Sequence, residues 1–216
     1  KTTIVNNFIN ITFPAANFSA SPVKGCIPLN VNFSDGSTAN PVVSQWVWDF
    51  GDPASGANNT SVLQSPLHIY NDTGIYDVQL IITNSEGCTD TIIKNDFVMV
   101  GQQPTADFIP KIDTGCHPFS VPFTNLSEAF TDEWNWTFTN GVTTYNSTAF
   151  SPTQVFSDTG DFDITLIASH HGCPNTLIID NAIFVKPAKP IFTATPTIFC
   201  ENDLPYTVTF TDASIG

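Results

Sequence analysis

The chain has 216 residues and carries six lysines, no arginine and twenty acidic residues, which gives a formal net charge of −14. This acidic balance predicts binding neither to nucleic acid nor to anionic lipid, because it repels both. No apolar run approaches the length of a membrane span and no signal peptide is visible at Lys1. We therefore expect no membrane insertion, and we expect the chain to be an internal part of a larger protein.

Short alternating runs follow one another along the chain and predict strands. Residues 29–33, LNVNF, and 76–82, YDVQLII, place apolar side chains at every second position, and residues 119–123 and 162–167 repeat these patterns. Sixteen prolines and twelve glycines interrupt the chain too often for long helices. We therefore expect an all-β chain of short strands.

The chain also repeats itself. The run SPLHIYNDTGIYDVQLI at 65–81 returns as SPTQVFSDTGDFDITLI at 151–167. The run GCIPLNVNF at 25–33 returns as GCHPFSVPF at 115–123. The two runs return after 86 and 90 residues, and self-similarity at such a spacing indicates a tandem array of structural repeats.

The repeat divides the chain into four predicted segments. They are the last strand of a preceding repeat at 1–13, whole repeats at 14–101 and 102–187, and the truncated start of a further repeat at 188–216, in which Cys200 takes the place of Cys26. Each whole repeat carries about seven strand-like runs, which is typical of an immunoglobulin-like β-sandwich. The short linkers contain proline, so we expect the sandwiches to be arranged end to end.

Three motifs, taken in order, resemble a known family. They are WDFGD at 48–52, SP.H.Y at 65–70 and TG.Y.V.L at 73–80. The set resembles the PKD domain (polycystic-kidney-disease repeat), closely over 14–101 and more loosely over 104–187. The cysteine-containing form of these motifs is similar to repeats in very large secreted proteins of the Bacteroidota, including SprB-type gliding-motility adhesins and other type IX secretion cargo.

This resemblance implies an extracellular, non-catalytic array at the bacterial cell surface. Its implied partners are neighbouring repeats of the same chain, secretion or motility machinery, other surface proteins and glycans. Some relatives bind calcium, and Asp49 and Asp52 would then be the candidate ligands in this chain.

Asp49 and Asp52 are also a candidate catalytic or metal-binding pair on their chemistry alone. In the second repeat their places are taken by Thr137 and Asn140, neither of which exchanges a proton near neutral pH. All of these residue types accept hydrogen bonds from backbone N–H groups in a turn. We therefore interpret the two aspartates as turn residues and expect no enzyme activity and no cofactor, with calcium as the open alternative.

Aromatic side chains alternate along one predicted strand in each repeat. They are Trp46, Trp48 and Phe50 in the first, and Trp134, Trp136 and Phe138 in the second. Exposed tryptophans could stack on sugars, but a Trp on this strand of an immunoglobulin-like sandwich usually fills the core. The other predicted core or turn residues are His68, Tyr70, Gly74, Tyr76, Gly160 and Phe162.

Three neighbouring residues near the end of the second repeat are metal-ligand types, namely His170, His171 and Cys173. They fall in a predicted hairpin turn, where adjacent side chains diverge, and no fourth ligand is near. We interpret them as a turn.

The five cysteines of an exported chain predict disulfides. One pairing lies within each repeat, Cys26–Cys88 and Cys116–Cys173. The other joins consecutive repeats, Cys26–Cys173. Cys26 is predicted in a turn before a strand and Cys88 beyond a turn at the opposite pole. A strand of about six residues separates the poles by roughly 20 Å, whereas bridged Cα atoms lie roughly 4.4–6.8 Å apart. We favour Cys26–Cys173, which leaves Cys116 for the next repeat and Cys88 for the previous one.

Two classes of function follow from these observations. The first is a stiff spacer in a giant surface adhesin, with a role in gliding motility or attachment. The second is an accessory module that engages substrate for a secreted hydrolase. Tandem repetition and the lack of an active-site pattern favour the first.

Overall fold

The computed structural model describes residues 13–195, 197 and 207–214. Most of the strand predicted at 1–13, and Cys200 of the last predicted repeat, lie outside these residues. The chain divides into two compact units. The first extends to Pro104 and includes Ser169–Pro174, and the second holds Thr105–Ala168 and the residues from Asn175 onward.

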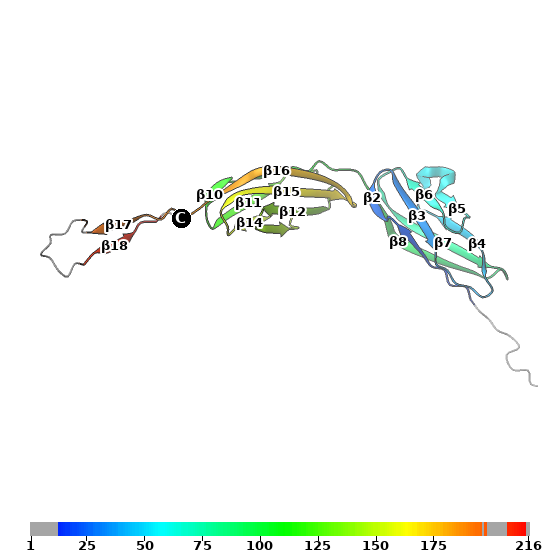
Figure 1. Ribbon diagram of the computed structural model, residues 1–216. Coiled ribbons are helices and arrows are strands. Elements are labelled where there is room, and N and C mark those ends of the chain that lie inside the picture. The colour runs from blue at the N-terminus through cyan, green and yellow to red at the C-terminus, as the bar shows by residue number, and fades with distance from the viewer. Residues whose placement is uncertain (1–12, 196, 198–206, 215–216) are drawn as a thin grey trace, which may run out of the picture. The chain divides into compact units, whose positions relative to one another are not determined.

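The first unit is a sandwich of two sheets, with strand orders β1-β3-β6 and β2-β8-β7-β4-β5 (Figure 1). Its strands are β1 (Phe18–Ser21), β2 (Lys24–Cys26), β3 (Leu29–Asp35), β4 (Val43–Asp49), β5 (Thr60–Ser61), β6 (Leu67–Tyr70), β7 (Gly74–Asn84) and β8 (Thr89–Gly101). A 3-10 segment, η1 (Pro53–Asn59), connects β4 to β5 and is interrupted at Gly56.

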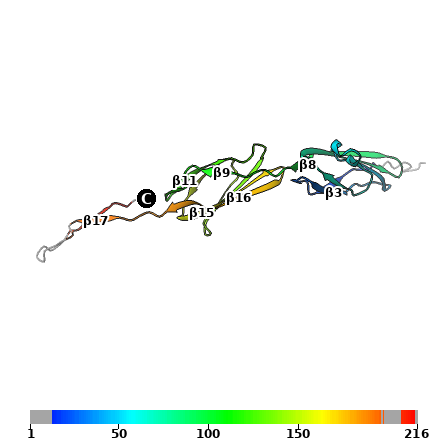
Figure 2. The ribbon, with the colours of Figure 1, turned by 90° about the horizontal axis from the view of Figure 1, so that it is seen from above.

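The second unit has sheets with strand orders β14-β11-β9 and β10-β16-β15-β12-β13. Its strands are β9 (Phe108–Pro110), β10 (Thr114–Cys116), β11 (Phe119–Asn125), β12 (Glu133–Thr139), β13 (Thr144–Ser147), β14 (Thr153–Phe156), β15 (Gly160–His170) and β16 (Cys173–Lys186). Figure 2 shows β9 and β11 on one side of this unit and β15 and β16 on the other. The tip of the β15–β16 hairpin, Ser169–Pro174, groups by its contacts with the first unit.

A separate two-stranded sheet follows β16 in the chain, within the second unit. β17 (Phe192–Thr195) and β18 (Thr209–Asp212) pair antiparallel, with Phe192 opposite Asp212. In the first unit, β1 and β3 also pair antiparallel, and Phe18 lies opposite Asp35 as Phe192 lies opposite Asp212.

Period-two alternation determines which face of each strand is buried. Along β3 the burial alternates strictly from Leu29 to Phe33, and the outward positions are Asn or Ser. The inward side chains of the two sheets form one core in each unit. Trp48 in the first unit and Trp136 in the second are almost fully buried.

The prediction of an all-β chain of immunoglobulin-like sandwiches is confirmed, and the two units have the same strand order. One local prediction was wrong. Cys26 does not lie in a turn but ends β2, which pairs parallel with the last strand, so that Cys26 lies opposite Gly101. Three residues are too few to show alternation, and the pairing depends on β8, which is distant in sequence.

Candidate functional site

The loop after β4 holds the two aspartates that the sequence singled out. Asp49 Oδ1 accepts hydrogen bonds from the Gly51 backbone N–H at 2.9 Å and from Asn59 Nδ2 at 2.9 Å. The Asp52 backbone N–H donates to Asn59 Oδ1 at 2.6 Å. Gly51 has φ of 69° and lies against the Asp77 carbonyl, so a side chain there would clash. Asp49 therefore acts on the turn itself.

The Asp52 carboxylate instead faces the core and meets a histidine. Asp52 Oδ2 lies 3.1 Å from His68 Nε2, and both residues are at most 4% exposed. The imidazole stacks on Phe50 with ring centroids 4.4 Å apart and meets the Tyr70 ring edge-on at 4.5 Å. Sequence reasoning missed this pair. Its signal was that Asp52 and His68 are both replaced in the second repeat, by Asn140 and Gln154.

In the second unit, the residues at the places of Asp52 and His68 make hydrogen bonds to backbone groups close to them in the sequence. Asn140 Oδ1 accepts hydrogen bonds from the Val142 and Thr143 backbone N–H groups at 3.1 Å and 2.7 Å. Gln154 Nε2 donates to the Val155 carbonyl at 2.7 Å. The amides thus make no buried contact like that between Asp52 and His68.

Two tyrosine hydroxyls complete the polar part of the first core. Tyr70 donates to the Phe50 carbonyl at 2.9 Å and Tyr76 to the Asp72 carbonyl at 2.8 Å. Burial raises the pKa of Tyr70 far above its ordinary value, and the Asp52 carboxylate adds to the rise. Both hydroxyls therefore act as hydrogen-bond donors and not as bases.

The tryptophans divide into inner and outer positions. Trp48 Nε1 donates to the Leu63 carbonyl at 2.8 Å and Trp136 Nε1 to the Ala149 carbonyl at 2.9 Å. Trp46 and Trp134 are only half-buried and pack against the edges of the cores. Phe50, Phe138, Phe156 and Phe162 lie inside the cores. No flat row of exposed tryptophans is present among the described residues.

An open groove of about 420 Å³ lies beside β6 in the first unit. Leu63, Leu67 and Ile69 line it and are more than two-fifths exposed, and Asn58 and Asn71 add polar groups. Across the residues that the structure describes, no three His, Cys, Asp or Glu side chains are grouped as metal ligands would be.

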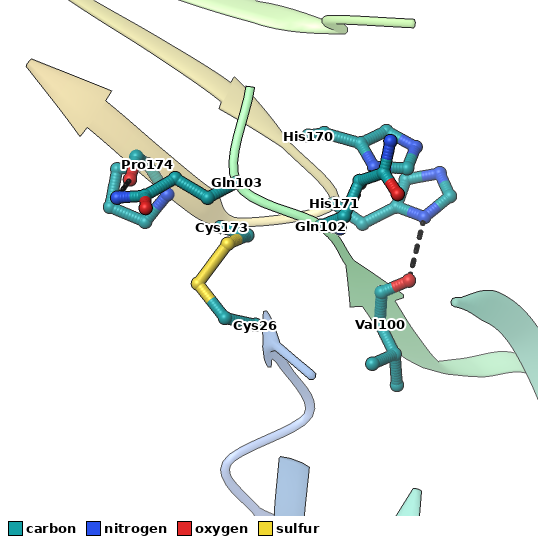
Figure 3. The surroundings of a disulfide bond; sticks show 8 residues. All are labelled: Cys26, Val100, Gln102, Gln103, His170, His171, Cys173 and Pro174. Atoms are coloured by element: carbon teal, nitrogen blue, oxygen red, sulfur yellow. Dashed lines mark hydrogen bonds between the residues drawn. A yellow bond between two sulfur atoms is a disulfide. The ribbon is translucent and has the colours of Figure 1, made fainter. Parts of the chain in front are cut away.

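A disulfide joins Cys26 of β2 to Cys173 at the start of β16 (Figure 3), with Cα atoms 4.6 Å apart. The predicted Cys26–Cys173 pairing is confirmed. The alternative pairing within each repeat is wrong for this structure, because Cys88 and Cys116 are free and exposed. Next to this bond, His170 is the last residue of β15 and His171 lies in the hairpin turn.

The hairpin tip fits closely against the end of β8. Gln103 Nε2 donates to the Pro174 carbonyl at 3.0 Å and the Gln102 backbone N–H to His170 Nδ1 at 3.3 Å (Figure 3). A methyl group on Gly101 would overlap the His170 carbonyl, so this position requires a glycine. The disulfide is thus one part of a packed contact.

Comparison with known proteins identifies the class of the first sandwich. Residues 12–100 match the family model described as PKD domain, so the chain contains a PKD domain there. Such domains are typical of extracellular or secreted proteins. Among the described residues, no helix has both the length and the apolar character to cross a membrane.

The chain is similar to parts of several bacterial proteins. It is 38% identical over 71 residues to a microbial collagenase of Vibrio alginolyticus, a match that covers 32% of this chain and 8% of that protein. The PKD1 domain of Vibrio anguillarum Epp is 27% identical, with 41% of this chain and 96% of that chain covered and a TM-score of 0.34. The PKD1 domain of the Vibrio cholerae metalloprotease PrtV is 28% identical, covering 40% and 98%, with a TM-score of 0.34.

Proposed function

We propose that this chain is a non-catalytic, load-bearing segment of a giant secreted adhesin at the bacterial cell surface, built from tandem PKD-like repeats. The observation that carries the proposal is the Cys26–Cys173 disulfide. The main chain passes between the two units after Pro104, after Ala168 and after Pro174. The disulfide adds a covalent connection that bypasses the chain between its two cysteines.

Two further observations support a mechanical role. The cores are apolar and aromatic, and the chemistry-bearing residues of the first unit, Asp52 and His68, are buried against each other. The chemistry-bearing residues of the first repeat are also not kept in the second, since Thr137, Asn140 and Gln154 take the places of Asp49, Asp52 and His68. Such replacement is expected of a scaffold and not of an active site. The proposed partners are neighbouring repeats, secretion or motility machinery, other surface proteins and glycans.

The location is tested on intact cells of the source organism. An antibody raised against the chain should label unpermeabilised cells, and brief external proteolysis should remove the signal. Labelling only after permeabilisation would contradict a cell-surface role.

A second candidate function is an accessory module of a secreted hydrolase. The similarity to a collagenase and the open groove beside β6, which exposes both apolar and polar side chains, favour it. In that case the chain should bind insoluble collagen or polysaccharide, and Leu67→Ser with Ile69→Ser should abolish binding while the melting temperature is kept. If the chain is an adhesin spacer, neither the natural chain nor the variant should bind collagen or polysaccharide.

A further inference from the structure

We propose that Cys116 and Cys88 are the two halves of a second disulfide junction, of the kind that Cys26 and Cys173 form. Cys116 would bond to the hairpin cysteine of a following PKD-like repeat, and Cys88 to the β2-type cysteine of a preceding one. This inference rests on the proposed tandem array. The partner is a repeat of the same kind, and a second copy of this chain provides one.

Cys116 occupies the same structural position as Cys26. β10 pairs parallel with β16 so that Cys116 lies opposite Lys186, just as Cys26 lies opposite Gly101. The next backbone N–H donates to the opposite carbonyl in both cases, from His117 at 3.1 Å and from Ile27 at 3.0 Å. Cys116 is free and exposed, so its thiol is accessible.

Cys88 occupies the position that Cys173 has in its hairpin. Gly87, with φ of 83°, precedes Cys88, and Gly172, with φ of 76°, precedes Cys173. Buried Asn84 accepts hydrogen bonds through Oδ1 from the Glu86 and Cys88 backbone N–H groups at 3.0 Å and 2.9 Å. The turn therefore holds the Cys88 backbone in place while its thiol is exposed.

One difference between the junctions sets their spacing. Gly101 allows the His170 carbonyl to lie against it, whereas Lys186 carries a side chain at the equivalent position. The Cys26 and Cys173 Cα atoms are 4.6 Å apart, near the short end of the range for disulfides, which extends to roughly 6.8 Å. A junction at Cys116 thus has roughly 2 Å of further separation in which to accommodate Lys186.

Charge complements this wider junction. The residue two before Cys173 is His171, whose Nδ1 lies 3.5 Å from the Val100 carbonyl, next to Gly101. The residue two before Cys88 is Glu86, and the residue in the place of Gly101 is Lys186. Docking in the same register brings exposed Glu86 toward exposed Lys186, so opposite charges favour the encounter.

The bond forms by thiol–disulfide exchange with a small disulfide oxidant such as glutathione disulfide. The Cys88 thiolate attacks one sulfur of the oxidant and releases one glutathione thiolate, and the Cys116 thiolate of the other chain then displaces the second. Two protein thiols become one disulfide, and the oxidant is reduced to two glutathione thiols.

The experiment uses the whole chain with Cys200→Ser, oxidised with glutathione disulfide at low salt and mapped by non-reducing peptide analysis. Peptides that join Cys88 to Cys116 should exceed the symmetric Cys88–Cys88 and Cys116–Cys116 peptides at least about tenfold, which corresponds to about 1.4 kcal/mol of preference. In urea the same thiols should pair statistically. A statistical ratio for the folded chain, or no Cys88–Cys116 peptide, would overturn the proposal.

Charge exchange tests the register. Glu86→Lys or Lys186→Glu should slow Cys88–Cys116 bonding several-fold at low salt, and the two together should restore it. Equal rates for all four chains would contradict the docking described here. As a matched control, Val142→Cys with Cys88→Ser places a thiol at a residue that is 92% exposed in the natural chain. Bonding of this thiol to Cys116 should not respond to Lys186→Glu.

The experiments on Cys88 and Cys116 can contradict this inference without contradicting the proposed function. Loss of the Cys88–Cys116 preference leaves the role of the Cys26–Cys173 bond untouched, because that bond is measured in a single chain.

Discussion

At the residue scale, a few positions explain why the two repeats differ. The first uses a buried carboxylate and imidazole, Asp52 and His68, where the second uses the amides Asn140 and Gln154. A buried hydrogen-bonded pair contributes only modest net stability when intact, but leaving one of its polar groups without a partner is costly. Gly101 is a second such position, because its lack of a side chain permits the hairpin contact.

A double-mutant cycle measures the Asp52–His68 pair. Asp52→Asn or His68→Gln alone should lower the free energy of unfolding by about 1–3 kcal/mol, because the remaining side chain stays buried with its hydrogen bond weakened or lost. The double variant, which reproduces the residues of the second repeat, should lose much less than the sum. Strict additivity in urea unfolding would contradict a coupled pair.

Gly101→Ala should loosen the hairpin contact. The new methyl group overlaps the His170 carbonyl, and a forced shift of this kind costs about 1–3 kcal/mol. Gly36→Ala is the control, since a methyl group there meets only ordinary contacts. Thermal unfolding of both variants should show a clear loss for Gly101→Ala alone, and equal losses would refute the steric explanation.

Asp35 makes the free energy of unfolding depend on pH in the acidic range. Burial would raise the pKa of its carboxyl, but hydrogen bonds from Ser37, Trp46 and Gln64 outweigh burial and lower that pKa below 3.8. A lowered folded-state pKa stabilises the fold above the unfolded-state pKa, and this stabilisation is lost as the pH falls through the folded value. The stability advantage of the natural chain over Asp35→Asn should therefore be present at about pH 6 and shrink by about pH 3 in urea titrations. A constant difference would contradict this.

At the element scale, the long alternating strands were predictable and the short ones were not. The runs at 29–33 and 76–82 show their buried faces directly, because one face of each strand meets the core. β2 and β10 have three residues each and pair parallel with strands far along the chain, so no local pattern reveals them. The Asp52–His68 pair was missed because its residues come from the loop after β4 and from β6, strands of different sheets, and no local pattern shows that they meet in the core.

The predicted strand over 46–50 can be tested by its two tryptophans. Trp48→Ala should destabilise the first unit by about 3–5 kcal/mol, because the indole is fully buried. Trp46→Ala should cost distinctly less, since its ring is half-buried and its Nε1 donates to Asp35 at 2.8 Å near the surface. Urea unfolding followed by circular dichroism ranks the two variants, and the reverse order would contradict the position of Trp48 inside the core and of Trp46 against it.

At the scale of the whole molecule, the Cys26–Cys173 disulfide carries the proposed mechanical role. Topology predicted this disulfide, since the two cysteines of one repeat lie too far apart to bond, and the structure has Cys26 bonded to Cys173. In the proposed load-bearing role, this covalent bond carries tension that would otherwise pass through the folded chain. The sequence did not predict the hydrogen bonds of Gln102 and Gln103 that accompany the bond, because these depend on how the hairpin tip is placed.

Pulling on the two ends of a single chain shows whether the disulfide carries the load. The disulfide encloses a sequence separation of 147 residues, which span about 500 Å when fully extended. With the bond intact, the fully unfolded chain should be shorter by about this length than after reduction or in a Cys26→Ser, Cys173→Ser variant. Equal extensions before and after reduction would contradict a load-bearing disulfide.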